Sequence, residues 1–258
     1  MSQSRNEAAG SLALNVGRFG EGRPLLYLHG IDGMRSSQPF VDHLASGAAV
    51  IAPDHPGFGK SEMPPWLESI HDMAYFYLRY LDEQGLEPVD IVGHSLGAWL
   101  ALEMAVRSPA SFRSLTLVSA AGIHLPGVPR GDLFMRAPDV VLRGMVVDGT
   151  LAEDLVRRTA ADQEVELRNR YAIARVGWHP PMYNPHLAKW LHRVSCPVQI
   201  VWGEGDAMLP LAYAEEFKRL IPGATLHVIR SCGHLPHVEQ PEKTASLVLS
   251  FIEKGARA

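Results

Sequence analysis

The pentapeptide G-H-S-L-G at residues 93–97 constrains the fold of this chain more than any other feature of its sequence. It follows a short apolar run at residues 89–92 and leads into an apolar, Ala-rich segment at residues 96–106. The run predicts a buried strand, and the segment predicts a central buried helix. A turn tight enough to join the two needs glycine on both sides. It leaves Ser95 projecting above the sheet edge beside a helix N-terminus, where the backbone favours negative charge.

Similar apolar runs recur along the chain, bounded by Gly, Pro or Asp. They lie at residues 25–28, 49–52, 115–118, 198–202 and 226–229. Their length and β-branched content are typical of strands buried on both faces of a parallel sheet. Helical spacing of apolar residues appears between them, at residues 73–81, 217–221 and 247–252. This alternation predicts an α/β fold with a doubly wound, mostly parallel sheet.

The alternation stops at residues 123–191. This stretch has no strand signal, and it is far longer than an ordinary surface connection. Amphipathic, charged segments with helical spacing occupy residues 140–147, 151–158 and 164–176. We therefore expect residues 123–191 to form a helical cap subdomain inserted into a core domain made of residues 1–122 and 192–258.

Net charge, cysteine content and the distribution of apolar residues argue against several partners and locations for this protein. The 258 residues carry 24 basic and 28 acidic side chains, a net charge of −4, so nothing favours nucleic acid or an anionic membrane as a partner. Two cysteines cannot build a disulfide framework, which favours a reducing compartment. Residues 1–10 lack the apolar run of a signal peptide, and no apolar stretch reaches the ~18–20 residues needed to span a bilayer. The expectation is a cytoplasmic protein without membrane segments, its oligomeric state left open.

A serine hydroxyl is a poor nucleophile unless a base removes its proton. His234 is the predicted base for Ser95 among the twelve histidines. It lies just after the run at residues 226–229, in a loop that a doubly wound sheet places at the same edge as Ser95. His237 is the local alternative, and His94 is expected to support the turn beside the serine.

The base in turn needs an acid that fixes its tautomer and stabilises the imidazolium. Asp206 follows the run at residues 198–202 and is the predicted acid. Glu204, two residues earlier, is the alternative. The order serine, aspartate, histidine along the chain is that of enzymes with this type of serine turn.

Backbone N–H groups are expected to hold the oxyanion of a tetrahedral intermediate. One donor is Leu96, which follows the nucleophile. The second is Ile31, because Gly30 lets the chain turn back over the serine. Asp32 would place a carboxylate near this hole, and the sequence gives no account of its role.

Five ordered motifs resemble the α/β-hydrolase superfamily across most of the chain. They are the His29-Gly30 turn, the D-x-P-G-x-G-x-S run at residues 54–61, the pentapeptide, Trp202-Gly203 with Asp206, and Gly233-His234 followed by Glu239-Gln240-Pro241. The resemblance implies the α/β-hydrolase fold. It also implies that residues 54–61 form a structural turn and take no part in catalysis.

The nucleophile narrows the chemistry further. Dehalogenases and epoxide hydrolases of this superfamily have Asp where this chain has Ser95, so the resemblance implies acyl transfer. The leading hypothesis is hydrolysis of a small apolar acyl or aryl ester.

The alternative is hydrolysis of a C–C bond in β-diketone-like acids, as in the meta-cleavage product hydrolases, or opening of an enol-lactone. Those C–C hydrolases usually have Trp where this chain has Leu235, and they use a cap arginine for the substrate carboxylate. Candidates for that arginine here are Arg168, Arg170 and Arg175. A ligand-binding receptor on the same fold is the non-enzymatic alternative.

Large apolar side chains in the predicted cap are candidates for a substrate pocket or for the core of the cap itself. They are Met135, Met145, Trp178, Met182, Tyr183 and Trp190. Serine acyl transfer needs no cofactor. The sequence contains neither a metal-ligand cluster nor the G-x-G-x-x-G fingerprint of a nicotinamide site, so no cofactor is expected.

Overall fold

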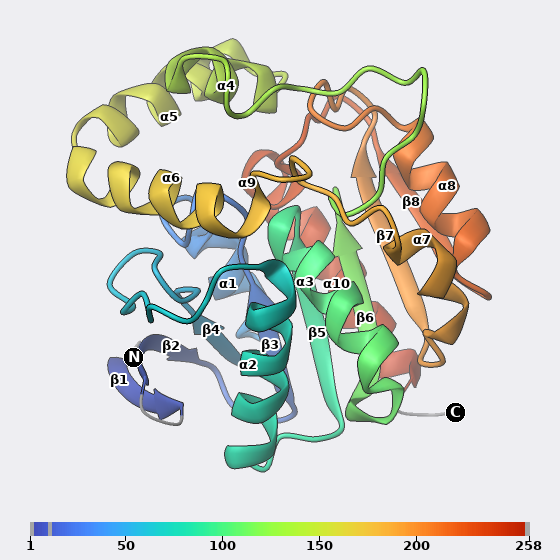
Figure 1. Cartoon of the computed structure of the whole chain (residues 1–258). Helices are drawn as coiled ribbons and strands as arrows, with labels where there is room; N and C mark the ends of the chain where they lie inside the picture. Colours follow the sequence, from blue (N-terminus) through green and yellow to red (C-terminus); the bar gives the residue numbers. More distant parts are fainter. Residues whose placement is uncertain (1–2, 10–11, 256–258) are drawn as a thin grey trace.

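The computed structural model describes residues 3–9 and 12–255, so residues 1, 2 and 10 of the N-terminal stretch considered above lie outside the described residues. The described residues form one eight-stranded sheet (Figure 1). In spatial order its strands are β1 (Gln3–Ala9), β2 (Leu12–Phe19), β4 (Ala49–Pro53), β3 (Pro24–Leu28), β5 (Val89–His94), β6 (Phe112–Val118), β7 (Val198–Gly203) and β8 (Thr225–Ile229). β2 pairs antiparallel with both β1 and β4, and every other pair is parallel. The predicted mostly parallel sheet is confirmed.

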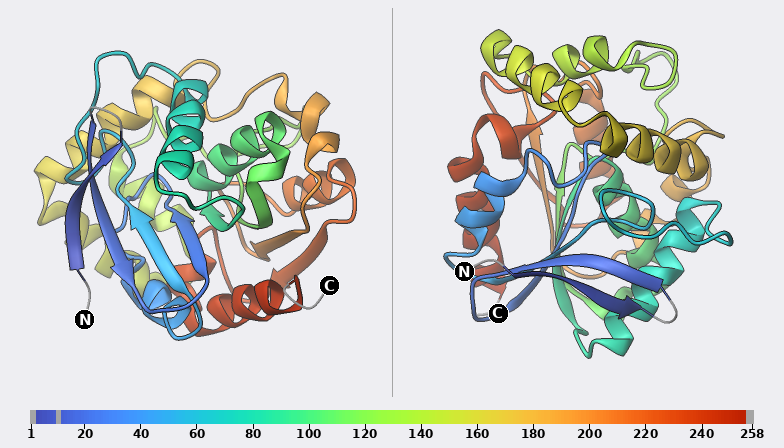
Figure 2. Two further views of the ribbon diagram at one scale, coloured as in Figure 1. Left: turned by 90° about the horizontal axis from the view of Figure 1, so that it is seen from below. Right: turned by 90° about the vertical axis from the view of Figure 1, so that its left-hand side faces the viewer.

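Helices cover both faces of the sheet (Figure 2). One face carries α2 (Ile70–Glu83), α3 (Leu96–Arg107) and α8 (Ala212–Leu220), and the other carries α1 (Gln38–Leu44) and α10 (Pro241–Gly255). The shorter helical segments are η1 (Pro109–Ser111), α7 (Leu187–Trp190), η2 (Leu191–Arg193) and α9 (Pro236–Glu239). Each face buries its own apolar core against the strands. This arrangement brings the loops after β3, β5, β7 and β8 to one edge of the sheet, the carboxyl edge.

Two features of the sheet differ from the sequence-based expectation. The strands β1 and β2 were not predicted, although Leu12, Leu14 and Val16 alternate with more exposed residues as in a half-buried strand. The run at residues 226–229 was expected to be buried on both faces, and this is wrong. β8 lies at the edge of the sheet, and Val228 is 41% exposed.

Residues 54–61 form a turn held by internal hydrogen bonds. Asp54 Oδ2 accepts from the Asn15 side chain at 2.8 Å and from Lys60 N at 3.0 Å, and Ser61 Oγ donates to the Asp54 carbonyl at 2.7 Å. Gly59 has φ +51°, and any side chain there would overlap the Asp54 carboxylate. The turn therefore ties the end of β4 to β2.

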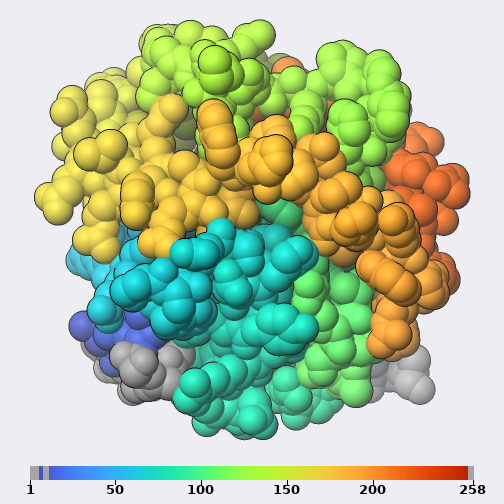
Figure 3. Space-filling view, viewed as in Figure 1, coloured from blue at the N-terminus to red at the C-terminus, as the bar shows by residue number. Residues whose placement is uncertain are grey.

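A helical insertion lies between β6 and β7. Its helices α4 (Pro138–Met145), α5 (Gly149–Ala160) and α6 (Gln163–Gly177) arch over the carboxyl edge of the sheet (Figure 1). The space-filling view shows this insertion, light green through yellow to orange, packed directly on the cyan segment that precedes and includes α2 (Figure 3). Arg168 and Arg175 make part of that contact, each donating at 2.9 Å to a backbone carbonyl, of Ser61 and of Pro65. The helical insertion is confirmed, while its exact division from the core at residues 123 and 191 stays a prediction.

The two ends of the insertion meet. Gly122 N donates to the Met182 carbonyl at 3.2 Å, and Asn184 N donates to the Gly122 carbonyl at 3.0 Å. Trp99 of α3 packs against Gly122, which has φ +111° and no room for a side chain. The insertion thus leaves and rejoins the core beside α3.

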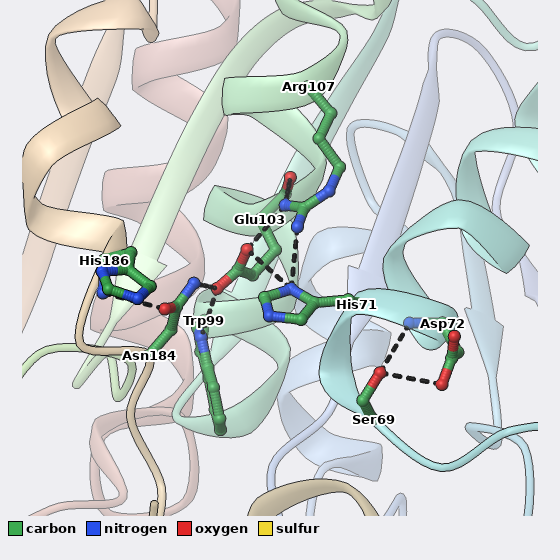
Figure 4. A network of polar contacts seen from close by, with 8 residues as sticks. All are labelled: Ser69, His71, Asp72, Trp99, Glu103, Arg107, Asn184 and His186. Atoms are coloured by element: carbon green, nitrogen blue, oxygen red, sulfur yellow. Dashed lines mark hydrogen bonds and ion pairs between the residues drawn. The ribbon is translucent and has the colours of Figure 1, made fainter.

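A buried carboxylate holds this junction to α3 (Figure 4). Glu103 Oε1 accepts from Trp99 Nε1 and from Asn184 Nδ2, each at 2.9 Å, while Oε2 accepts from Arg107 at 2.6 Å and lies 3.4 Å from His71 Nδ1. Burial opposes ionisation of this carboxyl, but the polar contacts with these four partners lower the pKa of Glu103 to about 2. An ionised side chain therefore links α2, α3 and the end of the insertion.

None of the helices in the described part of the chain is both long enough and apolar enough to cross a bilayer.

Candidate active site

Ser95 stands in a strained turn between β5 and α3. Its backbone has φ 50° and ψ −106°, a conformation that a side chain disfavours. Backbone hydrogen bonds hold Ser95 in this conformation: Ser95 N donates to the Val118 carbonyl at 2.9 Å, and Ala121 N donates to the Ser95 carbonyl at 3.2 Å. A side chain on Gly97 would overlap the Leu28 carbonyl, so α3 starts in direct backbone contact with β3. The turn thus fixes the serine at the carboxyl edge.

The structure brings the three predicted side chains into one hydrogen-bonded chain. His234 Nδ1 lies 2.8 Å from Asp206 Oδ2, and His234 Nε2 lies 3.1 Å from Ser95 Oγ. All three residues are buried, with at most 4% of their surface exposed. An ionised carboxylate can only accept, so the hydrogen of the neutral imidazole lies on Nδ1. Nε2 is then free to accept the proton of the serine hydroxyl.

Asp206 is itself held by the loop after β7. Its second oxygen, Oδ1, accepts from Met208 N at 2.9 Å and from Leu209 N at 2.8 Å. Glu204, the alternative acid, is exposed, and its backbone pairs with Ile229. The geometry thus gives Asp206, rather than Glu204, the contact with the histidine.

The two neighbouring histidines take other positions. His94 Nε2 donates to the His234 carbonyl at 3.0 Å and so supports the backbone of that loop. His237 is fully buried against the rings of Tyr27, Phe40 and His94. Burial lowers the pKa of His237 to about 3. Neither of these rings faces the serine hydroxyl as His234 does.

The insertion also contacts the histidine loop. His234 N donates to the carbonyl of Met145, the last residue of α4, at 2.6 Å. Glu239 bridges the histidine loop and the insertion: its Oε1 accepts from Gly233 N at 2.5 Å, and its Oε2 accepts from Val147 N at 2.8 Å. The E-Q-P motif thus uses its carboxylate to clamp the histidine loop to the insertion.

The predicted oxyanion donors belong to α3 and to the loop after β3. Leu96 is the first residue of α3, where a backbone N–H has no partner within the helix. Ile31 lies in the loop after β3 and faces the same cavity as Ser95 and His234. That loop is anchored by His29, whose Nε2 accepts from His55 N at 2.9 Å. Whether these two N–H groups bind an oxyanion stays a prediction.

A cavity of about 470 Å³ opens on Ser95 and His234. Its remaining wall comes from the insertion, at residues 130–135 and 178–182, and from Met208 and Leu209 after β7. This volume is in the range of sites for small organic molecules. The wall is largely apolar, with Leu133, Phe134 and Trp178 facing the cavity.

Five of the six residues predicted to line a pocket do so, in three different places. Met135, Trp178 and Met182 line this cavity. Met145 lines a smaller neighbouring one, and Trp190 lies in a surface depression near Glu103. Tyr183 is not among the lining residues in the described part of the chain. Its ring packs on His124 and under the guanidinium of Arg130, 5.1 Å away in each case.

Arg130 was not predicted as a site residue, although it lines the cavity that opens on Ser95. Its Nη2 donates to the Pro181 carbonyl at 2.6 Å, while Nη1 is buried and has no hydrogen-bond partner among the described residues. The predicted arginines lie elsewhere. Arg168 and Arg175 contact the segment before α2, and Arg170 lines the smaller cavity. Arg130 lies on an irregular loop without helical spacing, so the sequence carries no signal for its direction.

Comparison with known proteins decides the family. The model of the alpha/beta hydrolase fold family matches residues 23–241. The chain belongs to the α/β-hydrolase fold family. This α/β hydrolase is similar to a 2-hydroxymuconate semialdehyde hydrolase of Pseudomonas putida, at 30% identity over 97% of this chain and 94% of the relative.

Solved structures resemble this α/β hydrolase in fold. A meta-cleavage product hydrolase from Pseudomonas fluorescens IP01 superposes with a TM-score of 0.79 at 24% identity, covering 97% of each chain. An esterase from Exiguobacterium antarcticum superposes with a TM-score of 0.78 at 20% identity, covering 98% of this chain and 100% of that one. These likenesses establish a hydrolase fold common to C–C hydrolases and esterases, and leave the bond that is cleaved to the chemistry of the site.

Proposed function

We propose that this α/β hydrolase cleaves a C–C bond in small β-diketone-like acids, with Ser95 as nucleophile, His234 as general base and acid, and Asp206 as the group that orients His234. The observation that carries the proposal is Nη1 of the half-buried Arg130 on the wall of the reaction cavity, an atom that is buried and has no hydrogen-bond partner among the described residues. A buried donor without a partner is costly, and a carboxylate of the substrate would satisfy it with a charge-assisted bond. The relative named as a 2-hydroxymuconate semialdehyde hydrolase supports the same substrate class.

The mechanism follows from the hydrogen-bonded chain. Ser95 Oγ attacks the keto carbonyl while His234 Nε2, 3.1 Å away, takes the hydroxyl proton. The new oxyanion lies against the N–H groups of Leu96 and Ile31. When the C–C bond breaks, its electron pair passes into the keto-acid fragment, which takes the proton from His234. Water, deprotonated by His234, then hydrolyses the acyl ester of Ser95 and releases a carboxylic acid.

Arg130 has a defined part in this scheme. Its Nη1 would bind the carboxylate of the keto-acid fragment and so set which side of the carbonyl that fragment occupies. The ring of Tyr183 and the Pro181 carbonyl hold the guanidinium in place. Apolar side chains on the rest of the wall fit the carbon skeleton.

Ester hydrolysis is the second candidate, and two observations favour it. Leu235 follows His234, where the C–C hydrolases that the sequence resembles usually have Trp. The cavity wall is also apolar enough for a simple acyl or aryl group. The same cycle would apply, with an alcohol leaving in place of the keto-acid fragment.

One set of rate measurements tests both candidates. We expect a vinylogous diketone acid to be hydrolysed with a kcat/KM at least tenfold above that of p-nitrophenyl esters of graded acyl length. Ser95→Ala should abolish both activities, and activity retained in that variant would exclude the mechanism. Faster hydrolysis of the esters would make ester cleavage the function.

Arg130 provides the decisive variant. Arg130→Ala should lower kcat/KM for the diketone acid by about tenfold to a hundredfold, the range for a lost charge-assisted hydrogen bond, and change ester hydrolysis less than about threefold. Arg175→Ala is the matched control, because that guanidinium faces Pro65 rather than the cavity. An equal effect of Arg130→Ala on acid and ester would contradict a carboxylate-binding role.

A further inference from the structure

A second cavity, of about 70 Å³, adjoins the one that opens on Ser95. The two share three wall residues, Ile31, Leu133 and Phe134. We call the smaller one the side pocket. Its far wall is apolar and comes from the helices of the insertion, through Val141, Leu155 and Ile173 among others. The side pocket therefore lies beside the main cavity at these three residues, one of which, Ile31, is predicted to bind the oxyanion through its N–H.

One polar group in the side pocket has no use in the mechanism above. Both carboxylate oxygens of Asp32 are buried, and neither has a hydrogen-bond partner among the described residues. Arg35, on the same wall, has its ion-pair contacts with Asp162 and Glu166, each at 3.9 Å. A buried carboxylate without a partner costs several kcal/mol in general, and such groups are rare unless something binds them.

The surroundings of Asp32 define what can bind it. Burial raises the pKa of Asp32 to about 6, so the carboxyl is mostly ionised at pH 7 to 8. An ionised carboxylate only accepts hydrogen bonds, so its partner must be a donor. The guanidinium groups of Arg35 and Arg170 on the pocket wall oppose a cationic donor. A neutral hydroxyl satisfies both conditions, and the small volume limits it to a short chain.

The position of the side pocket assigns the hydroxyl to one part of the substrate. If Arg130 holds the carboxylate of the keto-acid fragment, that fragment occupies the main cavity. The other substituent stays on the carbonyl carbon in the acyl ester of Ser95, and it must then extend towards another part of the wall. The side pocket lies beside Ile31, where the oxyanion of that carbonyl is predicted to bind, and is therefore placed to receive this substituent.

We infer that the side pocket is an acyl-binding subsite whose Asp32 recognises a short acyl chain bearing a hydroxyl group. The inference rests on the hydrolase function proposed above and adds to it the nature of the acyl fragment. The acid released from Ser95 would then be a small hydroxy acid.

Two isosteric esters test the inference without requiring the diketone substrate. They are p-nitrophenyl 3-hydroxypropanoate and p-nitrophenyl butanoate, which differ by a hydroxyl in place of a methyl group. The unmodified protein should favour the hydroxylated ester by about tenfold or more in kcat/KM, because a site that bonds a hydroxyl rejects the analogue that lacks it. Asp32→Leu, similar in size, should invert that preference, and Asp32→Asn, which keeps one acceptor, should give an intermediate ratio.

The control variant is Glu166→Gln. Glu166 lines the same side pocket but is paired with Arg35, so the ratio of the two esters should stay within about threefold of its original value. Asp32→Leu should not lower the midpoint of thermal unfolding, because it removes a buried charge that has no partner. An equal loss of rate on both esters with an unchanged ratio would mean that Asp32 acts only on His234, and would overturn the subsite.

A binding measurement separates the failure of the subsite from failure of the proposed function. In Ser95→Ala, NMR titration should give tighter binding of 3-hydroxypropanoate than of butanoate, and the further change Asp32→Leu should remove the difference. Discrimination in binding, with no turnover of either ester or of the diketone acid by the unmodified protein, would refute the catalytic proposal and retain the subsite. No discrimination in binding or in rate would refute the subsite alone.

Discussion

At the scale of single residues, the two carboxylate oxygens of Asp206 have different partners. Oδ1 accepts from two backbone N–H groups of its own loop, and Oδ2 faces His234 Nδ1. The loop therefore fixes the carboxylate before the histidine meets it. An acid held in this way stabilises one tautomer of the imidazole and the imidazolium that forms when Ser95 is deprotonated.

Replacing this carboxylate should lower the catalytic rate and leave the fold intact. Asp206→Asn is expected to lower kcat by about 10⁴-fold, because an amide that donates to Nδ1 imposes the wrong tautomer. Stopped-flow or steady-state assays on any hydrolysed ester measure the loss. Glu204→Gln is the control: this exposed side chain does not contact His234, and its rate should match that of the unmodified protein. Comparable losses in both variants would contradict the assignment of Asp206.

The residues of the site were predictable to different extents, for physical reasons. Ser95, Asp206 and His234 each follow a strand of the parallel part of the sheet, and parallel strands end at one edge, so their proximity follows from topology. Arg130 and Phe134 lie in an irregular loop, where no periodicity tells which way a side chain points. Asp32 was noticed in the sequence, but its lack of a partner is a property of packing alone.

At the scale of elements, the junction of β5 and α3 depends on close backbone contact. Gly97 touches the Leu28 carbonyl of the neighbouring strand, so this contact fixes the position of the first turn of α3 relative to the end of β3. This contact connects Ser95 to the loop that carries Ile31. A displacement of α3 would therefore move the nucleophile and an oxyanion donor apart.

Adding one methyl group at this junction should be destabilising. Gly97→Ala is expected to lower the free energy of unfolding by about 1–3 kcal/mol, the usual range for overpacking, and to reduce kcat at least tenfold. Urea denaturation and ester assays on the same sample measure the two effects. Gly149→Ala is the control, since nothing lies within 4 Å of the added carbon at the start of α5. Its stability should be unchanged or slightly higher.

The predictability of elements followed their burial. The central strands appear in the sequence as continuous apolar runs, and the helices appear through the helical spacing of apolar residues. All of the predicted strands and helices are present. β1 and β2 pair antiparallel at the sheet margin, where polar residues such as Asn15 and Arg18 interrupt the apolar pattern of β2. β8, at the opposite margin, resembles an inner strand in sequence because residues 226–229 are mostly apolar, but only Ile229 among them is buried.

At the scale of the whole molecule, Glu103 joins parts of the chain that are distant in sequence. Its carboxylate contacts α2 through His71, its own helix through Trp99 and Arg107, and the end of the insertion through Asn184 (Figure 4). The pKa of this carboxyl is lower in the folded protein than its ordinary value. The ionised form therefore stabilises the fold, and protonation removes that stabilisation.

The pH dependence of stability should report this carboxylate. The contribution of Glu103 is complete above pH 4.5, its ordinary pKa, and is lost as the pH falls towards about 2. Glu103→Gln should lower the free energy of unfolding by up to about 3 kcal/mol at pH 7 and by almost nothing at pH 2. Denaturation curves at several pH values measure the difference. Glu215→Gln, at an exposed position, should show no such dependence, and a constant deficit for Glu103→Gln would contradict the role of its charge.

The meeting of the two ends of the insertion at Gly122 has a consequence for how such a protein changes over time. The segment begins and finishes at one spot on the molecule, so its length and sequence can alter without requiring any strand to move. Most of the main cavity wall lies in the insertion, whereas Ser95, Asp206 and His234 lie in the core. A segment from a relative, joined at residues 122 and 184, should therefore bring its own share of the selectivity, provided that it keeps the backbone contacts at residues 145 and 147 with the histidine loop.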